Sequence, residues 1–172
     1  MPLKLLGEVS QADLRFATDM MLDGAEWRTV TFGDHHALVR SIEPRSDIPD
    51  DVQEAFDRAR NALLYAWFYY ELLVVAETQA FSALELGLKV RLRCDDWNMK
   101  SRSLRHLTKE ARQRKLMPPE TDASSGMLDE MEMLAHLRND LAHGTGSLHS
   151  PAMVLPVFER CAAVIDCLYS AT

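Results

Sequence analysis

The stretch from residue 49 to residue 93 places the strongest constraint on the fold of this chain. No proline or glycine interrupts it between Pro49 and Gly87, and apolar residues recur along it at the helical period. A proline followed by Asp50 and Asp51 is typical of a helix N-terminus. The chain is therefore predicted to be mainly α-helical.

One helix over the whole of 49–93 is unusually long for a globular domain. We expect either one long bent helix or two helices joined by a kink near 76–79. Residues 62–75 are apolar on nearly all sides, so other helices or a partner chain should bury them. Because two-fold helical dimers use long central helices, we expect a homodimer in which this surface and the last helix meet a second copy.

Three further helices are predicted after this stretch. A basic helix spans about 103–115 and ends before Pro118-Pro119, a second spans about 127–142, and the last begins between Ser150 and Pro156. The 172 residues suffice for one domain with a real core. Residues 49–172 are therefore predicted to form an up-and-down helical bundle.

Residues 1–48 follow a different pattern and are predicted to form an N-terminal arm. A short helix is expected from Ser10 to about Leu22. Residues 27–32 and 37–42 are rich in β-branched and aromatic residues on either side of a turn, which predicts a small β-hairpin. His35 and His36 lie beside that turn, where we expect a solvated pair and no metal site.

Composition and cysteine usage fit a helical protein of the cytoplasm. Apolar residues make up 47% and charged residues 26%, and the N-terminus lacks the apolar core of a signal peptide. The longest apolar block contains Glu71 and is too short to span a bilayer, so no membrane association is expected. Cys94, Cys161 and Cys167 are an odd number without metal-like spacing, which indicates free thiols. No zinc-ligand cluster or phosphate-binding glycine loop is present, so we expect neither a metal nor a cofactor.

Charge is distributed unevenly along the chain. The net charge of −7 argues against a general nucleic-acid binder. Residues 89–115, however, contain ten basic and three acidic side chains, a net +7, which leaves −14 for the remainder. This basic segment is either a phosphate-contacting surface or merely a solvated, arginine-rich helix face. The candidate RNA-binding residues are Arg102, Arg105, Lys109 and Arg112.

Arg138-Asn139 and His143-Gly144 crowd the predicted end of the helix 127–142. Arginine offers a planar fork of donors suited to phosphate, and histidine moves protons near neutral pH. Together they suit the cleavage of a phosphodiester. On an ideal helix Arg138 and His143 lie about 140° apart, so they converge only if the helix unwinds at 142–144 or a second copy completes the site. The helix macrodipole favours the same residue types at a helix end without any catalytic role.

An arginine directly followed by asparagine, and then by a histidine after three further residues, resembles the signature of the HEPN superfamily. The resemblance covers about 49–170. It implies a small, all-helical and usually dimeric domain, and many such domains are metal-independent ribonucleases of toxin–antitoxin and other defence systems. In that case Arg138 would stabilise the pentacoordinate phosphate, His143 would act as general acid or base, and Asn139 would orient phosphate or histidine. Cleavage would leave a 2′,3′-cyclic phosphate.

Two other hypotheses stand beside the ribonuclease. The chain is a non-catalytic helical module that binds RNA, a nucleotide or a protein partner such as an antitoxin, or Arg138 and His143 are packing residues only. Glu77 is the fourth candidate catalytic residue, because a buried carboxylate is costly unless it is paired. We expect it to pair with Arg138 or His143; otherwise it belongs to a core ion pair that fixes helix register.

Overall fold

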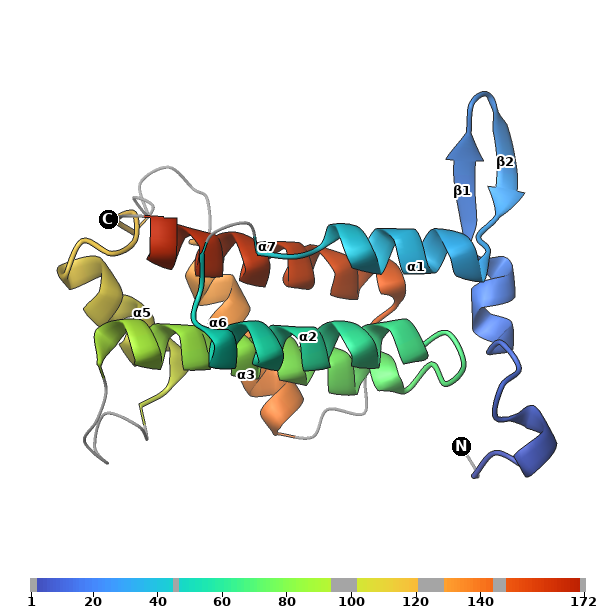
Figure 1. Cartoon of the computed structure of the whole chain (residues 1–172), viewed down its shortest axis with the longest axis horizontal. Helices are drawn as coiled ribbons and strands as arrows, with labels where there is room; N and C mark the ends of the chain where they lie inside the picture. Colours follow the sequence, from blue (N-terminus) through green and yellow to red (C-terminus); the bar gives the residue numbers. More distant parts are fainter. Residues whose placement is uncertain (1–2, 45–46, 94–101, 121–128, 144–147, 171–172) are drawn as a thin grey trace.

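Helix α3 (Leu72–Leu92) lies at the centre of a helical bundle (Figure 1). In this computed structural model, α3 packs against α2 (Asp50–Tyr65), α5 (Leu104–Gln113), α6 (Glu130–Ala142) and α7 (Pro151–Ser170). Its own sequence is apolar around most of its circumference, as a central helix requires. The structure describes residues 3–44, 47–93, 102–120, 129–143 and 148–170.

The contacts between helices fix their directions. The Tyr169 hydroxyl donates a hydrogen bond to the carbonyl oxygen of Gly87 (2.9 Å), near the C-terminal ends of α7 and α3. His149, just before α7, contacts Glu77 near the beginning of α3. The two helices therefore run in the same direction, whereas α2 follows the opposite course beside α3 (Figure 1). Helices α5 and α6 pack against each other as well as against α3.

The helical stretch predicted over 49–93 consists of two helices. The break lies at 66–71, so the predicted position of the kink, 76–79, is wrong. The predicted helix 103–115 is confirmed as α5 and 127–142 as α6, each slightly shorter than expected, and the last helix begins within the predicted interval. The predicted fold class, mainly α with a small N-terminal hairpin, is confirmed.

The N-terminal arm explains the position of this break. The backbone N–H of Asp13 donates to the carbonyl oxygen of Trp67 (2.8 Å). The carboxylate of Asp13 accepts from the backbone N–H of Tyr70 (3.3 Å) and from the guanidinium of Arg15, which also stacks on the Tyr70 ring. These contacts satisfy backbone groups that a continuous helix would have paired internally. A tertiary contact therefore decides where the helix stops.

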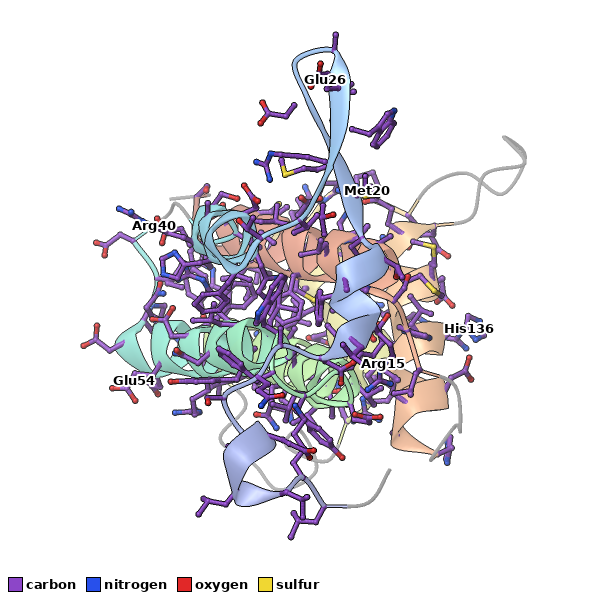
Figure 2. The ribbon with its side chains drawn as sticks, turned by 90° about the vertical axis from the view of Figure 1, so that its right-hand side faces the viewer. Arg15, Met20, Glu26, Arg40, Glu54 and His136 are labelled. Carbon is purple, nitrogen blue, oxygen red and sulfur yellow. The ribbon has the colours of Figure 1, made fainter. Side chains whose placement is uncertain are left out.

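The hairpin exists, but it lies nearer the N-terminus than predicted: of the two predicted strands, only residues 27–29 of the first are in a strand. Its strands are β1 (Met20–Asp23) and β2 (Glu26–Thr29), which pair in antiparallel fashion around Gly24, whose φ is +65°. Figure 2 shows the hairpin projecting away from the helices, with Met20 near its base and Glu26 at its tip. Of the helix predicted for 10–22, only a short 3-10 turn, η2 (Leu14–Thr18), is present; another short 3-10 turn, η1 (Leu6–Glu8), precedes it.

The segment predicted as the second strand, 37–42, is helical instead and belongs to α1 (Phe32–Ser41). The reason is a capping box: Thr31 Oγ1 accepts from the backbone N–H of Asp34 (3.3 Å), and the Asp34 carboxylate accepts from that of Thr31 (2.9 Å). The alternating pattern concealed this N-terminal signal. Consequently His35 is buried in α1, against expectation, with Nε2 3.0 Å from the carbonyl oxygen of Leu63.

Two other expectations concern thiols and membranes. Cys161 is buried and Cys167 half-buried, and both are free thiols, whereas Cys94 lies outside the described residues. Among the helices that the structure describes, none combines the length and the apolar character needed to cross a membrane.

Candidate functional site

Helix α6 carries the Arg138–His143 motif and keeps its helical geometry to its end. Asp129 caps its N-terminus by accepting from the backbone N–H groups of Met131 and Glu132, at 3.0 and 3.2 Å. At the other end, the backbone N–H of His143 donates to the carbonyl oxygen of Asn139 (3.0 Å). Arg138 and His143 were expected to converge either through unwinding of the helix end or through a second copy of the chain. Unwinding is not observed up to His143.

Arg138 is anchored against α3 by one edge of its guanidinium. Its Nε lies 2.8 Å from Oε1 of Glu85, whose other oxygen is 3.6 Å from Nζ of Lys89. The Arg138 side chain is 34% exposed and that of Glu85 only 12%. Neither terminal nitrogen of Arg138 is hydrogen-bonded to a residue that the structure describes. As far as the described residues are concerned, both terminal nitrogens of this guanidinium thus remain available to an anion.

Asn139 and His143 are both exposed on α6. Within the described part of the chain, neither side chain makes a hydrogen bond or an ion pair. The imidazole of His143 is therefore accessible at the helix end. On a regular helix the side chains of His143 and Arg138 point in directions about 140° apart around the helix axis. This helix alone therefore does not bring the two side chains of one chain together.

Glu77 does not pair with Arg138 or with His143, so that prediction is wrong. Its Oε2 lies 2.8 Å from Nδ1 of His149, and the partner of Arg138 is Glu85. Glu77 and Glu85 are eight residues apart, which places them near one face of α3 and about 12 Å apart along its axis. The helical period showed this shared face in the sequence, but it did not show which carboxylate meets which basic side chain.

The Glu77–His149 pair joins α3 to the segment before α7 and is largely buried. The Glu77 side chain is fully buried and that of His149 is 14% exposed. Burial raises the pKa of Glu77, while the hydrogen bond from His149 opposes this effect. Oε1 of Glu77 is buried without a hydrogen-bond partner among the described atoms. The nearby thiol of Cys161 stays neutral, because burial also raises its pKa. His149 was not singled out from the sequence, where only its position six residues after His143 marked it.

The basic segment on α5 is largely occupied by ion pairs. Arg112 holds both carboxylate oxygens of Asp129 (2.9 and 2.7 Å), and these side chains are 17% and 6% exposed, so this pair braces α5 against α6. Lys109 has no ion pair within the described ranges. Arg102 pairs with Glu110 (3.7 Å), and Arg105 pairs with Glu132 and contacts His136. The RNA-contacting role of the four residues stays a prediction, with Arg112 the least accessible of them.

An open hollow of about 590 Å³ lies on this side of α5, lined by Arg102, Ser103, His106, Lys109, Glu110 and Gln113. Its lining is polar, as a surface for phosphate groups requires. Among the residues described, no cluster of three or more His, Cys, Asp or Glu side chains is positioned to hold a metal ion.

Comparisons with protein-family models, curated proteins and solved structures found no match to this chain.

Proposed function

We propose that this chain is a metal-independent endoribonuclease in which the RNA 2′-hydroxyl attacks the adjacent phosphate and leaves a 2′,3′-cyclic phosphate. One observation carries the proposal. Arg138 is fixed through Nε by Glu85, while its two terminal nitrogens are unbonded among the described residues and its side chain is 34% exposed. An arginine that only stabilises packing would direct this fork at a carboxylate or a carbonyl oxygen. The resemblance of Arg138, Asn139 and His143 to the HEPN signature supports the same reaction.

The proposed mechanism uses the motif as follows. The terminal nitrogens of Arg138 bind two phosphate oxygens and stabilise the negative charge that builds on them in the transition state. His143 transfers a proton, which its exposure at the helix end permits. Asn139, one turn before His143, orients the phosphate or the imidazole.

The divergence of Arg138 and His143 leads to the proposal of a shared site. Because α6 stays helical through Ala142, His143 of a second copy completes the site around Arg138. This requires the homodimer expected from the apolar stretch 62–75, on whose edges Tyr65 and Val75 are 57% and 48% exposed. Sedimentation at micromolar concentration should give about twice the chain mass of 19.5 kDa.

A cleavage assay tests the chemistry. Total RNA is incubated with the protein and with Arg138→Ala, Arg138→Lys and His143→Ala, and the products are separated on denaturing gels and tested for cyclic phosphate. Each alanine variant should lose about 10²–10⁴-fold in rate, and lysine should not fully restore it because it lacks the bidentate fork. His36→Ala is the control, because His36 is exposed on α1, outside the motif and the basic segment. EDTA should have no effect.

Mixing two inactive variants tests the shared site. A mixed dimer of Arg138→Ala and His143→Ala retains one intact site if Arg138 and His143 come from different chains, so cleavage should return. It retains none if each site lies within one chain. Cleavage that requires a metal ion, or full activity of His143→Ala, would refute the mechanism.

A specific observation favours the binding-module alternative. One face of the hairpin exposes Met20, Leu22 and Trp27, which are 50%, 56% and 67% exposed. An apolar face of this kind is typical of a surface that docks a protein partner, as an antitoxin would be. If the wild-type protein cleaves no RNA, this alternative replaces the ribonuclease.

A further inference from the structure

A second histidine follows the motif closely in the sequence and is held by a buried carboxylate. His149 follows His143 by six residues and precedes α7. Its Nδ1 is 2.8 Å from Oε2 of Glu77 on α3. This contact has the form in which a carboxylate orients an imidazole: in neutral His149 the N–H on Nδ1 donates to Glu77, which leaves the lone pair on Nε2.

His149 and Arg138 are positioned by the same helix. Their partners, Glu77 and Glu85, lie two turns apart near one face of α3, about 12 Å along its axis. An RNA strand that runs along this face can therefore contact both side chains. The side chain of His143, in contrast, points away from that of Arg138 around the axis of α6.

The proposed reaction needs two proton transfers. The 2′-hydroxyl must lose a proton as it attacks, and the O5′ leaving group must gain one as its bond to phosphorus breaks. The HEPN-like motif contains one histidine, His143, for these two transfers. A second group with a lone pair directed outward would complete the chemistry.

We propose that His149 is the general base of this site and that Glu77 is the residue that positions it. The inference rests on the ribonuclease proposal above. Nε2 of His149 takes the proton of the 2′-hydroxyl while the O2′–P bond forms. The P–O5′ bond breaks, and His143 gives its proton to O5′. The products are a 2′,3′-cyclic phosphate and a 5′-hydroxyl, and no oxidant or metal ion takes part.

The burial of Glu77 distinguishes this role from a purely structural pair. Its side chain is fully buried, yet Oε1 has no hydrogen-bond partner among the described atoms. A buried carboxylate with an unsatisfied oxygen costs stability that an apolar side chain at the same position would avoid. The imidazole, by contrast, is 14% exposed, so one edge of the ring reaches the surface. Orientation of a reactive group explains why a carboxylate occupies this position.

A substrate with a better leaving group separates the base from the acid. In RNA with sulfur in place of the bridging O5′ atom, the thiolate departs without a proton, so the general acid is no longer needed. The variants are His149→Asn, whose amide N–H keeps the bond to Glu77, and His143→Ala. On ordinary RNA each should be about 10²–10⁴-fold slower than the wild type. On the sulfur substrate His143→Ala should recover and His149→Asn should not.

Each outcome decides the proposal. If His149→Asn recovers its rate on the sulfur substrate, His149 is the general acid. If this variant cleaves ordinary RNA at the wild-type rate, His149 takes no part in the reaction. Either result overturns the assignment of His149 as general base. No cleavage by the wild type overturns the ribonuclease proposal itself and the role of His149 with it. His36→Ala again serves as the control that should match the wild type.

A second measurement tests the positioning by Glu77 without RNA. Nitrogen-15 NMR distinguishes the two neutral tautomers of an imidazole. The Nδ1–H form of His149 should predominate in the wild type and should give way to the Nε2–H form in Glu77→Leu. If His149 has the same tautomer in both proteins, the positioning role is overturned. A contact that only packs against the carbon atoms of the ring would not shift the tautomer when Glu77 is replaced.

Discussion

Replacement of Glu77 by leucine should change the stability of the protein only slightly. Two effects oppose each other. The substitution removes the unpartnered oxygen Oε1, whose burial costs about 1–3 kcal/mol, and it loses the hydrogen bond from His149, which contributes about 1.5–3 kcal/mol. Leucine has a similar volume and fills the position without desolvating a charge. Only one partner of the pair is replaced, so the gain known from replacing whole ion pairs does not apply; because neutral His149 leaves no buried charge behind, the two effects largely cancel.

Thermal and urea unfolding followed by circular dichroism measure this change. We expect the free energy of unfolding to change by between about −2 and +1.5 kcal/mol. For a chain of this size, this means a Tm between roughly 4–8 °C lower and roughly 3–6 °C higher. Leu84→Ala is the control for the sensitivity of the assay, because Leu84 is fully buried on the same helix and its truncation should cost about 2–5 kcal/mol.

A loss of more than about 3 kcal/mol in Glu77→Leu, or roughly 6–12 °C in Tm, would refute this reasoning. It would show that the Glu77–His149 pair holds α3 to the segment before α7, and the positioning role proposed for Glu77 would lose its physical basis. Stable protein with impaired cleavage is the result that a functional carboxylate predicts.

Three further predictions concern other parts of the chain. Arg112→Met should lower the free energy of unfolding by about 1–3 kcal/mol in urea titrations because it leaves the Asp129 carboxylate buried without its partner, whereas Lys109→Met on the same helix should be neutral. Hydrogen bonds to the Arg15 guanidinium hold the pKa of Asp13 far below its ordinary 3.8, so the ionised carboxylate contributes its full stabilisation above pH 3.8 and loses it as the pH falls below that value. Urea unfolding of Asp13→Asn should therefore show a lower free energy of unfolding than the wild type at pH 7 and a flatter decline of that free energy toward pH 3. Gly87→Ala should stabilise α3 by about 0.5–1 kcal/mol, since an added Cβ meets its nearest neighbour at an ordinary 3.4 Å; a fall in Tm would contradict this.

Local patterns in the sequence were sufficient for the helical architecture. The apolar period over 49–93 and along the three later helices depends on residues within a few positions of each other, so it can be recognised without a structure. For the same reason the sequence placed the Arg138–His143 motif at the end of a helix. The N-terminal arm was predicted less well, because the alternating pattern in α1 concealed its capping box.

Only the tertiary structure decided how these elements meet. The helix break at 66–71 depends on Asp13, more than fifty residues away, and the arm supplies the hydrogen bonds that the interrupted helix lacks. The helical period placed Glu77 and Glu85 near one face of α3, but the assignment of His149 to the first and Arg138 to the second depends on how α6 and α7 pack. Periodicity shows which side of a helix is used, whereas ion pairs between helices are set by contacts that no local pattern encodes.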